Sequence, residues 1–293
     1  MPVYDLGYRV WEGKRRGPLL RWLAIPRFAY MDLAGRKAAI YVFSMAWMPF
    51  LLLAGYIYLL VNYRFLQTLG IPARILFPID AALFNLLLDL QLFFCFIFAV
   101  MLSPDLIARD LHHRAIVLYF VKPISRWEYL LGKFAILMSL CLLLTWVQPA
   151  LLFLIQWAVR PEDPTWRTTL WRADLGVLRA ITLYGWTASA GVTLLALALS
   201  ALVRNPRHVA TTLLVFPVGA WMVAGVLAEV LGTAFRVLSP LHAMRELGTW
   251  FFGLPTDARA PVWAAWLSWG GLAALCALIL VWRLRRAARG GVA

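Results

Sequence analysis

Residues 83–133 decide the fold class, because they join one long apolar run to one polar segment. The run at residues 83–102 reads LFNLLLDLQLFFCFIFAVML, and the polar segment at residues 103–133 reads SPDLIARDLHHRAIVLYFVKPISRWEYLLGK. An apolar run of about 20 residues is long enough to cross the hydrocarbon core of a bilayer as a helix. The run therefore predicts a membrane-spanning helix, and the polar segment needs a separate explanation.

The rest of the chain repeats this apolar pattern, with 63% hydrophobic residues among 293. Five further segments are long and apolar enough to span: residues 38–61, 134–159, 176–203, 209–231 and 262–282. Lipid offers no hydrogen-bond partners to the backbone, so isolated spans must be helical. We predict an all-α, polytopic membrane protein with six transmembrane helices. Its expected parts are a basic N-terminal segment (1–37), the transmembrane domain (38–282) and a basic tail (283–293).

Positive charge is distributed unequally between the two sides of the predicted domain. One side carries 19 Lys and Arg residues and the other carries 9. The positive-inside rule places the richer side, with both termini and residues 103–133, in the cytoplasm. The net charge of +14 then lies along the cytoplasmic face of the cell (inner) membrane, where it attracts anionic lipid headgroups. This excludes nucleic acid as the partner that the charge implies.

The polar segment has the signals of two helices. Ser103, a proline and Asp105 predict a helix start, and Pro123 predicts the end of that helix. Ser125 and Glu128 have the spacing of a capping box, which predicts the start of the next helix and leads into the third span. We interpret residues 103–133 as a short helix on the membrane surface, joined rigidly to a span. Such a helix can pass a push from a soluble partner into the membrane domain.

Two other segments are predicted to lie at a membrane surface. Residues 19–37 mix basic and aromatic side chains, which favours an interfacial helix over a solvated basic tail. Residues 232–261 are too apolar for a water-exposed loop, with a helix start at Ser239 and breaks at Gly248 and Gly253. They fit either two short helices dipping into the outer leaflet or an amphipathic hairpin lying on it.

Polar residues inside the predicted spans are candidates for a pathway lining. These are Asn85, Asp89, Gln148 and Thr187. An intramembrane carboxylate is costly, so Asp89 is expected to face a cavity or a partner. The alternative is an internal hydrogen bond from Asp89 to Gln148 or Asn85 that only locks the helices together.

Signatures of catalysis are absent from the sequence. It contains no Walker A motif, no HExxH and no G-x-S-x-G turn. Cys95, Cys141 and Cys276 each fall inside a predicted span, which favours ordinary membrane-core residues over a disulfide or metal site. We therefore expect a protein that is not an enzyme, with no metal site and no cofactor of its own.

The polar segment resembles that of ABC-2 type transporter permeases, the membrane subunits of type V ABC transporters. The similarity lies in Ser103–Asp110, in Leu118–Arg126 and in Glu128–Lys133, with Lys122 where an arginine is frequent. The resemblance implies a coupling helix that docks on a separate ABC ATP-binding subunit, which would hold the ATP and Mg²⁺. It also implies that a second permease copy completes the transport path, as a homodimer or with a related permease.

The resemblance assigns roles to particular residues. The implied ATPase contacts are Asp105, Arg109, Asp110, Arg114 and Arg126, and the implied coupling junction is Pro123, Ser125, Glu128 and Gly132. Two alternatives stay open. One is a membrane force transmitter of the same architecture that moves no substrate, and the other is an intramembrane enzyme acting on lipid with Asp89 as acid or base.

Overall fold

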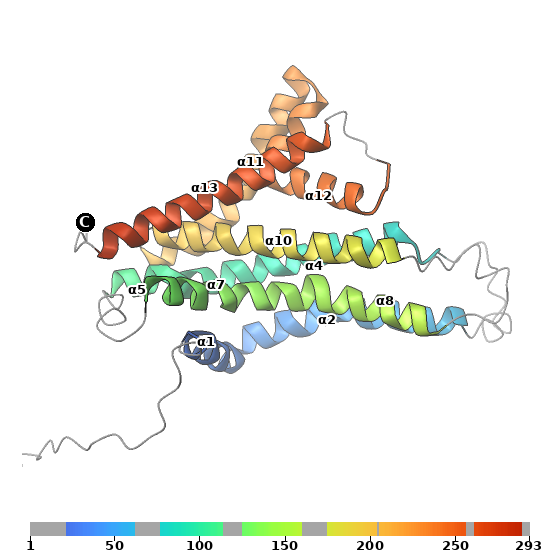
Figure 1. The fold of residues 1–293 in the computed structure, drawn as a ribbon, viewed down its shortest axis with the longest axis horizontal. Helices are drawn as coiled ribbons and strands as arrows, with labels where there is room; N and C mark the ends of the chain where they lie inside the picture. Colours follow the sequence, from blue (N-terminus) through green and yellow to red (C-terminus); the bar gives the residue numbers. More distant parts are fainter. Residues whose placement is uncertain are drawn as a thin grey trace, which may run out of the picture.

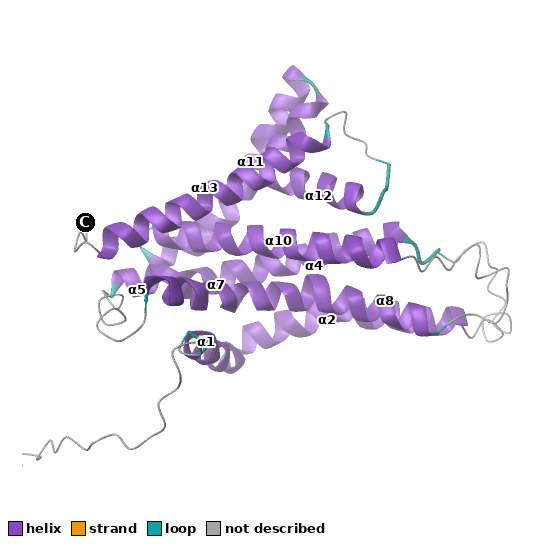
Figure 2. Ribbon diagram, viewed as in Figure 1, coloured by secondary structure: helices purple, strands orange, loops and turns teal. Residues whose placement is uncertain are grey.

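The computed structural model describes residues 22–61, 77–113, 125–159, 175–203, 205–255 and 261–288. The elements in these ranges are all helices (Figure 2). Two residues with an implied role, Arg114 and Pro123, lie outside the described residues.

Six helices in the described chain are long and apolar enough to cross a membrane, which confirms the all-α, multi-pass class. They are α2 (Lys37–Val61), the continuous helix Ala81–His112, the continuous helix Arg126–Ala158, α10 (Leu175–Leu202), α11 (Pro206–Leu231) and Val262–Arg283 of α13 (Val262–Ala288). The second consists of α4 (Ala81–Ser103), η3 (Pro104–Ala108) and α5 (Arg109–His112). The third consists of α7 (Arg126–Leu142), η4 (Leu143–Val147) and α8 (Gln148–Ala158).

Helix α10 is the central helix, and it packs against α4, α7 and α13 (Figure 1). Small residues on α10 permit this close packing. At Gly185 a Cβ atom would lie 2.9 Å from the backbone oxygen of Thr145, so only a glycine lets η4 approach this closely. The most buried helix is therefore also the one that fixes the positions of its neighbours.

A short helix, α1 (Ala24–Gly35), lies across one end of the bundle (Figure 1). It falls within residues 19–37, where the sequence predicts a helix. The Tyr30 hydroxyl hydrogen-bonds to Ser139 of α7. Gly132 of α7 packs closely against the Ile25 side chain of α1. Helix α1 is thus fastened to the start of the third span.

The predicted helix start at Ser103 is wrong. Ser103 has helical backbone angles and makes no side-chain cap, and the helix runs on through Pro104 without a break. Pro104 has no N–H to donate, and the helix continues from it through a single π-helical turn, η3, an irregularity that occurs inside α-helices. The second span and the first part of the polar segment therefore form one continuous helix.

The connection between α11 and α13 holds a 3₁₀ helix, η5 (Thr233–Leu238), and α12 (Pro240–Phe251). Helix α12 begins where Ser239 and Pro240 predict, although the Ser239 side chain makes no cap hydrogen bond. The predicted break at Gly248 is wrong, because α12 continues to Phe251. Gly248 is needed for packing instead, since a Cβ there would lie 2.7 Å from Oδ1 of Asn85.

Candidate functional site

Charged side chains from three helices gather at the end of the bundle that holds α1 and α5. Asp105 in η3 lies between two arginines: Arg36 Nη2 is 2.5 Å from its Oδ2, and Arg109 Nη1 is 2.8 Å from its Oδ1. Arg36 lies at the junction of α1 and α2 and also pairs with Asp32. Hydrogen bonding to Asp105 raises the pKa of the Arg36 guanidinium, so this cation stays charged.

A second pair joins α5 to α7. Lys133 Nζ is 2.8 Å from Asp110 Oδ2, and the two side chains are only 8% and 15% exposed. The Tyr129 hydroxyl donates a hydrogen bond to the same carboxylate oxygen at 2.7 Å, and Lys133 donates to the backbone oxygen of Asp105. Buried charges persist when they are paired and hydrogen-bonded in this way. We call Arg36, Asp105, Asp110 and Lys133 the charge latch.

The latch changes the interpretation of the implied ATPase contacts. Asp105 and Asp110 face inward and bind other helices of the same chain, whereas the Arg109 side chain is 56% exposed. Arg126 is exposed at the start of α7. Of the described candidates, Arg109 and Arg126 thus have side chains exposed at the surface, and the two acids connect that surface to α1 and α7.

The predicted capping box at the start of α7 is confirmed. The Ser125 hydroxyl accepts a hydrogen bond from the Glu128 N–H at 3.2 Å, and the Glu128 carboxylate accepts one from the Ser125 N–H at 2.6 Å. Gly132, one turn further on, is buried against α1, where a Cβ would lie 2.9 Å from a side-chain carbon of Ile25. The junction residues therefore set both the start of α7 and its contact with α1.

The π turn of η3 is completed by a residue from another helix. The Ser200 hydroxyl of α10 accepts hydrogen bonds from the N–H groups of Ile107 and Ala108, both at 3.0 Å. It also donates to the backbone oxygen of Ser103 at 2.7 Å. One buried hydroxyl thus bonds three backbone groups of the turn, and fixes the latch segment to the central helix.

Replacing this hydroxyl is expected to be costly. Ser200→Ala removes three buried hydrogen bonds between α10 and the turn, and we expect a loss of about 2 kcal/mol in the free energy of unfolding. Ser44→Ala is the matched control, because the Ser44 hydroxyl bonds only the Ile40 oxygen of its own helix and is exposed. Denaturation of the purified chain in mixed micelles measures both, and equal losses would show that Ser200 does not support the turn.

The polar residues inside the spans do not form the predicted pairs. Gln148 contacts Gln91, with 2.8 Å between their amide groups, and not Asp89. Asp89 instead accepts a hydrogen bond from the Tyr184 hydroxyl at 2.9 Å and lies 3.8 Å from the Arg245 Nε. Gln148 therefore does join two helices by a hydrogen bond, as the alternative interpretation expected. Its partner is Gln91 and not Asp89.

The two remaining polar candidates have different surroundings. Asn85 is buried beside Gly248, and its Oδ1 has no hydrogen-bond partner among the described residues. Thr187 accepts a hydrogen bond through its backbone oxygen from the Trp269 indole at 3.2 Å. Sequence reasoning missed Gln91, Tyr184 and Arg36, because each gains its partner only through the packing of separate helices.

Gln148 and Asp89 therefore lie in two different places. Gln148 holds α8 to α4 within the bundle, whereas Asp89 lines a cavity that is described below. No family model and no curated protein matches the chain. The charge latch and its exposed arginines are consequently the features from which a function has to be argued.

Proposed function

We propose that this chain is the permease subunit of an ABC-2 type transporter, coupling ATP hydrolysis by a separate ATP-binding subunit to substrate movement across the membrane. The observation that carries the proposal is the charge latch. It ties the segment that resembles a coupling helix to two other helices, through Arg36 at 2.5 Å and Lys133 at 2.8 Å. A segment that only capped a span would not need ion pairs to both neighbours, one of them with the buried Lys133.

The latch gives the proposal a mechanical route. A partner that pushes on the exposed Arg109 acts on one continuous helix, Ala81–His112, and not on a hinged surface helix. Movement of that helix displaces Asp105 and Asp110 together, since they lie five residues apart on it. Their ion pairs transmit the displacement to the junction of α1 and α2 and to α7, so three elements move as one unit.

The proposal includes the partners that the resemblance implies. An ATPase subunit holds ATP and Mg²⁺ on the cytoplasmic side, where the positive-inside rule also puts both termini. A second permease copy, identical or related, completes the path across the cell membrane. This chain binds no nucleotide and no metal itself.

Purification of the tagged chain from its own cells in a mild detergent tests the proposal. We expect a stoichiometric ATP-binding protein to accompany it, identified by mass spectrometry. Arg109→Glu should weaken this association about tenfold or more, because it places an opposing charge at the contact.

The matched control for this experiment lies at the other end of the bundle. Arg236 of η5 is also exposed, so Arg236→Glu introduces the same charge change far from the latch and should leave the association intact. Undiminished recovery of the ATPase with Arg109→Glu would contradict the docking assignment. Recovery of no ATP-binding protein in several mild detergents would contradict the proposed function as a whole.

A further inference from the structure

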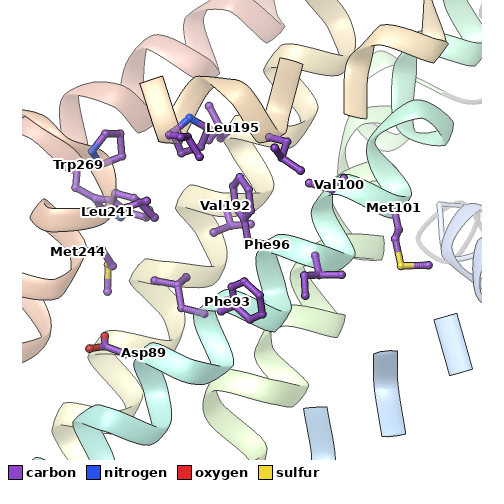
Figure 3. Close-up of a pocket in the computed structure, with 16 residues that line it drawn as sticks. Asp89, Phe93, Phe96, Val100, Met101, Val192, Leu195, Leu241, Met244 and Trp269 are labelled. Carbon is purple, nitrogen blue, oxygen red and sulfur yellow. The ribbon is translucent and has the colours of Figure 1, made fainter. Parts of the chain in front are cut away.

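A cavity of about 570 Å³ lies between α4, α10, α11, α12 and α13 (Figure 3). Its walls are almost entirely apolar, and its volume falls within the range of small-molecule sites. Residues on its open side are exposed: Phe93 is 59% exposed, Val218 46% and Leu241 42%. The cavity is therefore accessible from the surroundings of the bundle and is not a sealed packing defect.

The cavity is elongated along α4. Its lining residues on this helix recur at every turn from Asp89 to Met101. At 1.5 Å per residue this row is about 18 Å long. Asp89 lies at one end of the row in Figure 3, and Met101 lies at the other. An extended apolar chain fits this shape better than a compact solute does.

Asp89 is the one charged residue among the described residues that line the cavity. Its Oδ1 accepts a hydrogen bond from the Tyr184 hydroxyl at 2.9 Å. The Arg245 Nε lies 3.8 Å from its Oδ2, which is too long for a hydrogen bond. An ionised carboxylate can accept about four hydrogen bonds. The end of an apolar cavity thus carries an acid with unused acceptor capacity.

Arg245 is a weak resident partner for this acid. Its side chain is 72% exposed, so few contacts with the protein hold it in place. A cationic ligand that approached Oδ2 would take over the place of the guanidinium without adding net charge to the site. Arg245 is in this sense a displaceable counter-ion, whereas the buried Tyr184 stays in place and orients the carboxylate.

We propose that this cavity binds an amphiphile with an extended apolar chain and a protonated amine head, the amine on Asp89 and the chain along α4. The inference deepens the proposed function by naming the substrate class of the permease, and it rests on that function only for the role of the site. Binding itself needs neither ATP nor the ATPase subunit. Failure of one proposal is thus distinguishable from failure of the other.

Equilibrium binding of radiolabelled dodecylamine to the full chain in phosphatidylcholine nanodiscs tests the proposal, with empty nanodiscs as background. We expect saturable binding that weakens about tenfold or more in Asp89→Asn, which keeps the acceptor for Tyr184 but loses the charge. Arg245→Gln should tighten binding about threefold, because it removes the competing cation. Asp80→Asn is the matched control, since Asp80 caps the start of α4 outside the lining and Asn caps equally well.

Probes with the same chain and another head separate the alternatives. Dodecanol should compete poorly, and equal competition would overturn the role of Asp89 in recognition. Dodecanoate that binds more tightly than the amine and depends on Arg245 would overturn the choice of a cationic head. Absence of saturable binding by all three probes, in a chain that melts normally, would overturn the cavity as a ligand site.

Discussion

Asp110→Ala is expected to lower the free energy of unfolding by about 3 kcal/mol, because it leaves a buried lysine without its counter-ion. Lys133 is 8% exposed and lies 2.8 Å from the Asp110 carboxylate. After the substitution its remaining contact within hydrogen-bond distance is the backbone oxygen of Asp105 at 3.2 Å. The Tyr129 hydroxyl also loses its hydrogen bond to Asp110. Denaturation of the purified chain in mixed micelles measures the loss.

Two further variants distinguish the loss of the ion pair from a general loss of stability caused by any substitution in this region. Asp110→Ala combined with Lys133→Met removes both charges and should regain most of the lost stability. Arg109→Ala removes a side chain that is 56% exposed, and we expect a change within about 0.5 kcal/mol. If the double variant were less stable than Asp110→Ala alone, the loss would not come from an unpaired buried charge.

Gly191→Ala is expected to cost about 3 kcal/mol, because the added methyl group has no space. A Cβ on Gly191 would lie 2.2 Å from Cζ2 and 2.6 Å from Cε2 of Trp269. The Trp269 residue is only 7% exposed, and its indole donates a hydrogen bond to Thr187 at 3.2 Å. The Trp269 ring has to shift from its place between α10 and α13.

A glycine with open surroundings provides the matched control. Gly219 in α11 has no atom within 4 Å of the position of a Cβ, so Gly219→Ala should not lower stability and should raise it by up to about 1 kcal/mol, because alanine favours the helix more than glycine does. Trp269→Leu should lower stability alone but lower it less in the Gly191→Ala background, since the two sites share one contact. Equal stabilities of Gly191→Ala and Gly219→Ala would show that α10 and α13 are not closely packed here.

The features that sequence predicts well here are those set by local chemistry. The six spans follow from length and composition, since each needs only enough apolar residues. The capping box at Ser125 and Glu128 closes within one turn of chain, so its spacing alone predicts it. The helix at residues 24–35 is also set by local chemistry, since the mixture of basic and aromatic side chains in residues 19–37 predicts it.

The features that sequence does not predict depend on distant residues. Ser103, Pro104 and Asp105 have the composition of a helix start, yet the helix continues because Ser200 supplies hydrogen bonds from a helix far away in the chain. Whether a proline ends a helix or only opens a π turn is decided by such a neighbour. Local pattern alone cannot reveal it.

The pairing of polar side chains across helices is similarly hidden. Asp89 and Gln148 are both polar and both lie within predicted spans, but the rotation of each helix brings Asp89 to Tyr184 and Gln148 to Gln91. A polar residue in a span predicts that a partner exists and does not say which one. The charge latch likewise becomes visible only when α1, α5 and α7 are placed together.

Photo-crosslinking in living cells tests the central claim most directly, which is that the end of α5 docks on an ATP-driven partner. A photoreactive phenylalanine analogue at position 109 replaces the exposed arginine, and the same analogue at position 250, on the exposed side of α12, is the control. We expect position 109 alone to yield an adduct with one protein that binds ATP. Adducts with lipid only, or the same adduct from both positions, would contradict the account.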